Sequence, residues 1–301
     1  MLNVCQAGDE IVAARTLYGG THTQLAVNFR KLGITTTFVD SEDPENFARA
    51  ITPKTKLLYA ETIGNPSMNV IDIEKVAKIA EQAELPLFID NTFASPYLCR
   101  PFQWGAAIVM HSATKFIGGH GTTLGGVVAE AGRFHFDHDK FPLFHESVDH
   151  YGGLTWAGNF GEYAFLTRLR AEGLRDIGPA LAPHSAFLLA QGVETLAFRM
   201  QAHVDNARRV AEWLAADKRV ASVNWAGLKD HEHYELAQKY LPKGPGSVFG
   251  FTIAAPSSTS TGTWTWASSN TAVASINSST GAVTLGVPGT AIITATQGST
   301  A

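Results

Sequence analysis

The chain has 301 residues, of which 45% are hydrophobic and 17% are charged, with a formal net charge of -4. This composition is typical of a globular protein with a sizeable core, and the acidic balance lacks the basic surface expected of a nucleic-acid-binding protein. The longest apolar stretch, residues 180–198, is interrupted by Pro183, His184, Gln191 and Glu194, so we expect no membrane-spanning segment there. The N-terminus lacks the basic segment of a secretory signal, and we therefore expect a cytoplasmic protein.

Cysteine and histidine usage gives no sign of a disulfide or a metal site. Cys5 and Cys99 lie far apart in the sequence, and we predict two reduced, packed thiols. Two pairs of histidines have spacings found in metal sites: His135 with His138, and His231 with His233. No cysteine or acidic partner completes a ligand set, so surface histidines are the preferred interpretation and no metal is predicted.

In the first half of the chain, apolar runs alternate with segments of helical periodicity. The predicted strands are residues 11–14, 35–39, 56–61, 87–89, 107–110 and 126–129, and the predicted helices are residues 21–32, 44–51 and 73–83. Continuous apolar strands separated by amphipathic helices predict an α/β fold, with a mostly parallel sheet and helices on both faces. Ligands bind beyond the carboxyl ends of such strands. Glu61, Asp90 and Lys115 each lie at such an end and are expected to share a site.

The second half of the chain is mainly helical before it changes character. Predicted helices at residues 160–174, 183–199 and 203–216 precede short strands at 221–223 and 247–251, which indicate a second, smaller α/β unit. From residue 263, short β runs such as 282–284 and 290–296 alternate with Ser, Asn and Gly turns. The tail therefore predicts an all-β fragment.

A change of composition suggests a domain boundary near residue 254. No charged residue or histidine occurs after Lys243, and residues 254–262 are small and typical of a linker. We therefore predict four parts: a large domain (1–150), connecting helices with a partial small domain (151–253), a linker (254–262), and the all-β fragment (263–301).

The segment around Lys115 is the most informative part of the sequence. Lys115 follows the apolar run 107–110, has Ser112 and Thr114 on its N-terminal side, and is followed by a Gly-rich turn. A lysine at the end of a buried strand is expected to be buried, which disfavours its charge and lowers its pKa. Such a lysine can form a Schiff base, and neighbouring hydroxyl and backbone N–H groups can hold a phosphate. The pattern predicts pyridoxal phosphate (PLP), and a solvated lysine beside a loop is the alternative.

Three further residues have a cofactor-binding and an ordinary interpretation. Asp90 either caps a turn or pairs with a protonated pyridine nitrogen. Tyr18, at a Gly turn, either packs locally or stacks on a cofactor ring. Asn65, in Gly64-Asn65-Pro66, either shapes a turn or donates to the cofactor's phenolic oxygen.

Taken in order, these motifs resemble the Cys/Met-metabolism family of PLP-dependent enzymes, over about residues 2–253. The motifs that carry the resemblance are Leu17-Tyr18-Gly19-Gly20-Thr21, Glu61-Thr62-Ile63-Gly64-Asn65-Pro66, Asp90-Asn91-Thr92 and Ser112-Ala113-Thr114-Lys115. Residues 150–154, 174–178 and 186–196 resemble the branch of the family that acts on O-acetylhomoserine with sulfide. The resemblance implies PLP fold type I, the aspartate-aminotransferase-like fold.

The resemblance also implies a role for each matching residue. Lys115 would form the Schiff base with PLP and move protons between substrate carbons. Asp90, with Thr92 beside it, would hold the pyridine nitrogen, and Tyr18 would stack on the ring and assist proton transfer. The remaining cofactor-binding residues would be Ser112 and Thr114 for the phosphate and Asn65 for the cofactor and the substrate carboxylate.

The implied reaction is a γ-replacement in which O-acetyl-L-homoserine and sulfide give homocysteine and acetate. The family further implies a homodimer or homotetramer. Within the same family, cystathionine γ-synthase, cystathionine γ-lyase and methionine γ-lyase activities remain alternatives. A catalytically inactive chimeric fragment with a surface module is a further alternative.

Both ends of the chain depart from the family pattern. The N-terminal arm, a Gly-containing phosphate loop and the arginine that holds the substrate carboxylate have no counterpart in this sequence. Residues 263–296 instead resemble a partial bacterial Ig-like (group 2) module. Because charge-assisted bonds to phosphate are strong, we expect this chain to retain PLP poorly and to show little or no turnover.

Overall fold

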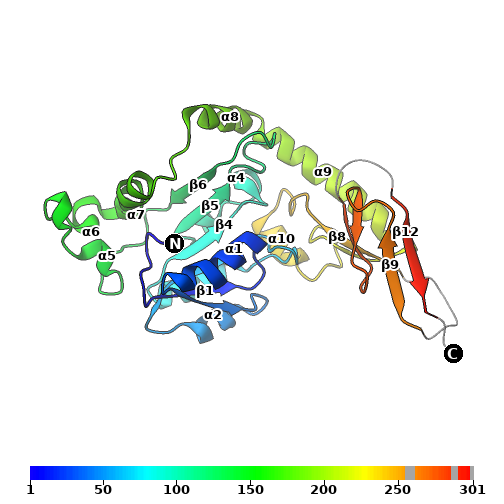
Figure 1. Cartoon of the computed structure of the whole chain (residues 1–301), viewed down its shortest axis with the longest axis horizontal. Helices are drawn as coiled ribbons and strands as arrows, with labels where there is room; N and C mark the ends of the chain where they lie inside the picture. Colours follow the sequence, from blue (N-terminus) through cyan, green and yellow to red (C-terminus); the bar gives the residue numbers. More distant parts are fainter. Residues whose placement is uncertain (255–261, 286–290, 299–301) are drawn as a thin grey trace.

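The computed structural model describes residues 1–254, 262–285 and 291–298, and its centre is a six-stranded mixed sheet (Figure 1). The strand order is β2-β1-β3-β4-β5-β6, and every neighbouring pair is parallel except β5–β6. The strands are β1 (Glu10–Ala14), β2 (Thr35–Val39), β3 (Thr55–Glu61), β4 (Leu87–Asp90), β5 (Ile108–Ser112) and β6 (Gly126–Glu130). The predicted mostly parallel α/β sheet is confirmed.

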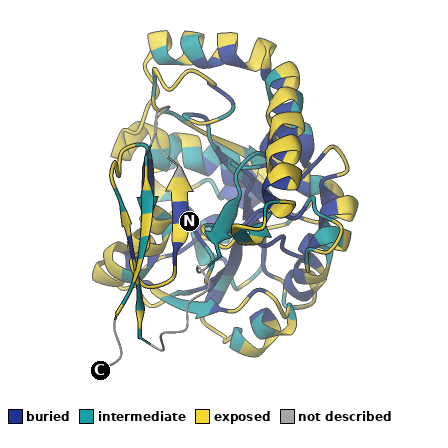
Figure 2. Cartoon of the chain, turned by 90° about the vertical axis from the view of Figure 1, so that its right-hand side faces the viewer, coloured by how far each residue is buried: buried dark blue, intermediate teal, exposed yellow. Residues whose placement is uncertain are grey.

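The central strands are buried because their side chains are apolar on both faces. Residues 57–60 of β3 and 87–89 of β4 are all buried, and buried residues are concentrated in this sheet (Figure 2). Cys5 and Cys99 are free and buried, as predicted, and burial raises the pKa of each thiol to about 12.

The helices that accompany the sheet are mostly short. They are α1 (Gly19–Thr23), continued by the π-helical η1 (Gln24–Phe29), α2 (Glu45–Ala50), α3 (Ile73–Gln82), α4 (Ser95–Leu98) and the 3₁₀ turn η2 (Pro101–Trp104). In α3, the side chain of Asp72 accepts a hydrogen bond from the Lys75 N–H and caps the helix. The apolar residues of α3 recur at helical spacing and are buried on the face of the helix that packs toward the sheet.

After β6 the chain forms a helical region at the left and top of Figure 1. It contains α5 (Pro142–His145), η3 (Asp149–Tyr151), α6 (Trp156–Phe160), η4 (Gly161–Tyr163), α7 (Ala164–Arg168), η5 (Leu169–Ile177), α8 (Pro183–Glu194) and α9 (Leu196–Ala215). The predicted helix break at residues 200–202 is wrong. The break falls at Thr195, because Met200 is buried within one continuous apolar stripe of α9 and no Gly or Pro interrupts it.

Helix α9 leads from the central region to two smaller antiparallel sheets (Figure 1). Helix α10 (Tyr234–Tyr240) lies between the central region and the smaller sheets (Figure 1). One sheet has the order β10-β11-β8-β7 and the other pairs β12 with β9. Their strands are β7 (Val220–Asn224), β8 (Gly250–Ile253), β9 (Trp264–Ser268), β10 (Ala274–Ile276), β11 (Ala282–Leu285) and β12 (Ile293–Gln297). β8 begins three residues later than the predicted strand.

The described tail is all-β, as predicted, and part of it joins the smaller α/β unit. β11 pairs antiparallel with β8, which sets Val283 opposite Phe251 across the sheet. The predicted linker, residues 254–262, lies mainly outside the described residues. Among the described residues, no helix is both long and apolar enough to cross a membrane.

Candidate functional site

Three polar side chains stand together where the central strands end. Glu61 is the register partner of Asp90 on the neighbouring strand, and Asp90 is the partner of Met110. Register partners in a parallel sheet point to the same face, and so do residues two apart on one strand. Glu61, Asp90 and Ser112 therefore share one face at the carboxyl edge of the sheet, as the sequence predicted for the two acids.

Thr92 connects Asp90 to the end of β5. Its hydroxyl donates to Asp90 Oδ1 at 2.5 Å, and its backbone N–H donates to the same oxygen at 2.9 Å. The Thr92 hydroxyl oxygen also accepts the backbone N–H of Ser112 at 2.8 Å. One side chain thereby sets the position of the carboxylate and of the strand end that precedes Lys115.

Glu61 holds the turn that presents Tyr18. Glu61 Oε1 accepts the backbone N–H of Tyr18 at 2.6 Å, across 43 residues of sequence. Tyr18 is the N-cap residue of α1, and its side chain is 56% exposed. The buried carboxyl thus fixes the backbone, while the phenol ring remains available to a ligand.

Both acids are buried, and burial disfavours their charged forms. Burial raises the pKa of Glu61 to about 8, and the nearby Asp90 adds to the rise, whereas the Tyr18 N–H opposes it. Burial also raises the pKa of Asp90, against the hydrogen bonds from Thr92 and Tyr59. The fully buried Tyr59 beside them has a strongly raised pKa, chiefly from burial. Such a site favours a cationic ligand group, which would pair with a carboxylate that water no longer solvates.

Lys115 lies on the turn that follows β5, and its side chain is exposed. The expectation that this lysine is buried was wrong, because the turn buries Ala113 and Ile117 and leaves the side chain of Lys115, between them, exposed. Backbone bonds from Lys115 N–H to Ser112 O (3.2 Å) and from Gly119 N–H to Lys115 O (2.8 Å) define the turn. Thr114 is tied to the start of β6, since its Oγ1 accepts the Gly125 N–H at 3.0 Å.

Asn65 lies in the loop after β3 and is half-buried. This loop approaches its neighbours so closely that a Cβ at Gly64 would lie 2.1 Å from Asn69 Oδ1 and 2.7 Å from Thr16 Oγ1. Glycine at position 64 is therefore required by the packing, and it holds the backbone next to Asn65 in one place.

On the opposite face of β5, His111 is buried and its Nδ1 has no hydrogen-bond partner. Burial lowers the pKa of this imidazole to about 4. Within the described residues, no group of three or more His, Cys, Asp and Glu side chains is arranged to hold a metal ion.

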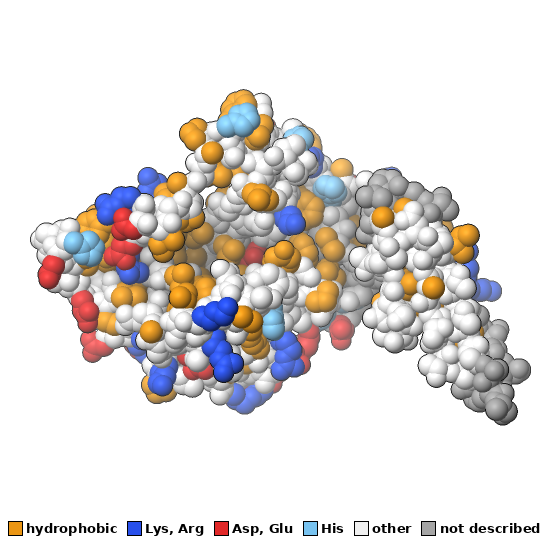
Figure 3. Space-filling model, viewed as in Figure 1, with side chains coloured by type: hydrophobic (Ala, Val, Ile, Leu, Met, Phe, Trp, Pro, Cys, Tyr) orange, Lys and Arg blue, Asp and Glu red, His pale blue; other side chains and the backbone are white. Residues whose placement is uncertain are grey.

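The structure thus joins Asp90, Thr92 and Ser112 by direct hydrogen bonds and places Tyr18 beside them through Glu61. Sequence reasoning missed the Glu61–Tyr18 contact, although the position of Glu61 at a strand end, level with Asp90, was a usable signal. The space-filling view shows a hollow on this face, bordered by apolar side chains, below α8 and above α1 (Figure 3).

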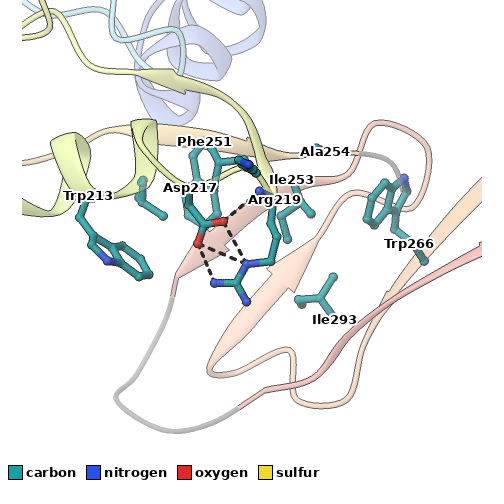
Figure 4. Close-up of a pocket in the computed structure, with 12 residues that line it drawn as sticks. Trp213, Asp217, Arg219, Phe251, Ile253, Ala254, Trp266 and Ile293 are labelled. Carbon is teal, nitrogen blue, oxygen red and sulfur yellow. Dashed lines mark hydrogen bonds and ion pairs between the residues drawn. The ribbon is translucent and has the colours of Figure 1, made fainter. Parts of the chain in front are cut away.

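A separate cavity of about 650 Å³ lies between the end of α9 and the smaller sheets (Figure 4). Trp213, Phe251 and Trp266 line it, and Arg219 closes one side in an ion pair with Asp217 at 2.6 Å. It contains none of the predicted site residues.

Comparison with known proteins identifies the class. The sequence model of the family described as "Cys/Met metabolism PLP-dependent enzyme" matches residues 1–297, and the chain belongs to this family. The family is PLP-dependent, and the strand ends bring together the aspartate and the tyrosine that the sequence predicted for such a site.

Particular relatives narrow the comparison. The chain is 46% identical over 262 residues to the O-acetyl-L-homoserine sulfhydrylase of Leptospira meyeri, covering 84% of this chain and 59% of the relative. It is 44% identical over 253 residues to the homocysteine/cysteine synthase of Saccharomyces cerevisiae, covering 83% of this chain and 57% of the relative. The chain therefore spans less than two thirds of the length of these curated relatives.

Solved structures agree with the fold. An O-acetylhomoserine (thiol)-lyase from Campylobacter jejuni, which carries N′-pyridoxyl-lysine-5′-monophosphate, has a TM-score of 0.81 at 31% identity. That match covers 84% of this chain and 63% of the other. The O-acetylhomoserine sulfhydrylase of Wolinella succinogenes has a TM-score of 0.75 at 32% identity, covering 85% and 70% of the two chains. These neighbours support PLP fold type I.

Proposed function

We propose that this chain is the PLP-binding part of an enzyme that exchanges the acetate of O-acetyl-L-homoserine for sulfide, giving homocysteine and acetate. The observation that carries the proposal is the strand-end cluster, in which Thr92 links Asp90 to the strand that ends just before Lys115. The names of the similar proteins from Leptospira and Wolinella support the substrate.

The residues present fit the chemistry of PLP. Asp90 is a buried carboxyl group held by Thr92 and Tyr59, and a protonated ring nitrogen would offset its desolvation. Lys115 is an exposed primary amine on a backbone-bonded turn, suited to covalent attachment of an aldehyde. When bound, PLP supplies an electron sink that stabilises negative charge at the substrate α-carbon.

Each chain residue then has a defined task. Asp90 holds the ring nitrogen in its protonated form, and Thr92 keeps the carboxylate in place. Tyr18, whose backbone is anchored by Glu61, would stack on the ring. Lys115 would hold the cofactor covalently, and its Nζ would accept the proton from the substrate α-carbon.

The remaining residues hold the phosphate of the cofactor and orient the cofactor and the substrate. Ser112 and Thr114, with nearby backbone N–H groups, hold the phosphate. Asn65 orients the phenolic oxygen of the cofactor and the substrate carboxylate. In the net reaction, the bond from the γ-carbon to the acetate oxygen breaks with its electron pair on acetate, and hydrosulfide forms the new C–S bond. The sulfur keeps the single proton of hydrosulfide, so the products are the neutral thiol of homocysteine and an acetate anion.

We further propose that the assembled protein is a cytoplasmic homodimer or homotetramer. Several large apolar side chains on β6, α8 and α9 are exposed, which is typical of a surface covered by another subunit. They are Val127, Val128, Phe187, Val193 and Phe198. We also propose the division at residues 254–262 and a partial Ig-like module after it, whose strand β11 pairs with β8 across that division.

The test measures attachment and reaction separately. The purified chain is mixed with PLP, its visible spectrum is recorded, and the adduct is reduced with borohydride and mapped by peptide mass spectrometry. We expect one pyridoxyl group on Lys115, its loss in Lys115→Ala, and its retention in the control Lys218→Ala at an exposed surface position. Labelling spread over surface lysines, unchanged by Lys115→Ala, would refute the site.

Product analysis then tests the substrate. Homocysteine formed from O-acetylhomoserine and sulfide supports the proposed reaction. Release of ammonia and an oxo acid from cystathionine or methionine alone would instead indicate a lyase. Attachment at Lys115 with no turnover of any of these substrates would leave the cofactor site standing and refute the proposed activity for this chain.

A further inference from the structure

Arg199, on the first turn of α9, contacts the turn that carries Lys115. Its Nη1 donates to Phe116 O at 2.7 Å, and its Nη2 donates to Ile117 O at 3.3 Å. The same Nη2 donates to Gly192 O at 2.6 Å, and Nε donates to Thr195 Oγ1 at 3.0 Å. One guanidinium therefore bonds to the lysine turn and to the end of α8.

These carbonyls are the ones that a helical turn leaves without partners. Residues 113–119 form such a turn, because Gly118 N–H bonds to Ala113 O and Gly119 N–H bonds to Lys115 O, both at 2.8 Å. No further helical turn follows to donate N–H groups to the carbonyls of Phe116 and Ile117. A cation at a helical C-terminus stabilises such carbonyls. The planar fork of arginine reaches several carbonyls at once, which a lysine ammonium cannot do.

Close packing holds the same two segments together. A Cβ at Gly192 would lie 2.3 Å from Gly118 O and 2.6 Å from Ile117 O, so α8 lies directly against the lysine turn. The ring of Phe116 also packs edge-on against His203 of α9, with ring centroids 5.5 Å apart. The turn is thus held from one side by α8 and α9 together.

We propose that Arg199 is a positioning residue that clamps the Lys115 turn to the α8–α9 junction and so sets where the lysine amine stands relative to Asp90. Helix α9 runs on to the smaller sheets (Figure 1), so the clamp couples that part of the molecule to the lysine. The role of Lys115 in this inference rests on the proposed function, whereas the clamp itself does not.

Hydrogen–deuterium exchange tests the clamp without requiring activity. In Arg199→Met, we expect the peptide covering residues 113–119 to exchange at least tenfold faster than in the unmodified chain, while the peptide covering β4 is unchanged. The matched control is Arg208→Met, which removes an exposed arginine of the same helix and should leave exchange of the turn unchanged. Arg199→Lys should give an intermediate increase.

Borohydride trapping of PLP gives the second measurement. The share of pyridoxyl label found on Lys115, relative to all other lysines, should fall at least threefold in Arg199→Met, recover in part in Arg199→Lys, and stay constant in Arg208→Met. Equal exchange of residues 113–119 in Arg199→Met and Arg208→Met would overturn the proposal. If Arg199→Met does not fold, Arg199→Lys decides: exchange of the turn at the unmodified rate overturns the clamp. Absence of Lys115 label in the unmodified chain counts against the proposed function, and the exchange result still decides the clamp.

Discussion

Replacing Glu61 by glutamine should change how stability depends on pH. Glu61 is 8% exposed, and its pKa is raised from 4.5 to about 8, mainly by burial. As the pH rises, the unfolded chain loses this proton first, so the folded state is progressively destabilised between about pH 4.5 and pH 8. Glutamine keeps the shape and an acceptor for the Tyr18 N–H but cannot ionise.

The size of the effect follows from the shift. Linkage between pKa values of 4.5 and about 8 gives roughly 1 kcal/mol of destabilisation at pH 5 and roughly 4 kcal/mol at pH 8. The free energy of unfolding of Glu61→Gln, relative to the unmodified chain, should therefore increase by about 3 kcal/mol from pH 5 to pH 8.

Urea unfolding at pH 5, 6, 7 and 8 measures this difference. Glu81→Gln, which changes an exposed glutamate on α3, is the control and should show no such trend. A difference between Glu61→Gln and the unmodified chain that stays constant within about 0.5 kcal/mol over this range would refute the burial argument.

Three other substitutions test the packing and electrostatics of the site. Thr92→Val should lower the free energy of unfolding by about 2 kcal/mol, since the buried Asp90 and the half-buried Ser112 each lose a bond. Thr36→Val, which removes a buried hydroxyl with no partner, should be neutral or stabilising. Gly192→Ala should destabilise by about 2 kcal/mol through its contact with the lysine turn, while Gly19→Ala, with open space around it, should not destabilise. The pKa of His111 is lowered to about 4, so the folded state loses stability as the pH falls from 6.5 to 4. Over this range the free energy of unfolding of His111→Gln should fall by about 3 kcal/mol less than that of the unmodified chain.

Urea unfolding at pH 7 checks the first two substitutions, and a pH series checks the third. Equal losses in Thr92→Val and Thr36→Val would show that the Thr92 hydroxyl does not bridge the strand ends. A neutral Gly192→Ala would mean that α8 does not lie against the lysine turn. If His111→Gln loses as much stability between pH 6.5 and pH 4 as the unmodified chain, groups other than His111 cause that loss.

The strands and the residues at their ends could be predicted from the sequence. Alternating apolar runs identify a parallel sheet, and such a sheet brings strand ends to one edge, so the partnership of Glu61, Asp90 and the β5 end follows from topology alone. The motifs around Lys115 and Asp90 were also sufficient to predict PLP and the family, which the match over residues 1–297 confirms. Local periodicity carries this information because it depends on residues two to four positions apart.

The tertiary structure decided what each end residue does. Exposure of Lys115 depends on the direction in which the turn leaves the sheet, and the single α9 helix depends on burial of Met200 against the core. The anchoring of Tyr18 by Glu61 spans 43 residues, and the contact of Arg199 with the lysine turn spans 83. No local pattern specifies such pairs, because they form only when separately folded elements pack together. The sequence by itself determined which chemical groups stand at the sheet edge, and only the packing of α8, α9 and the strand ends decided how those groups are held.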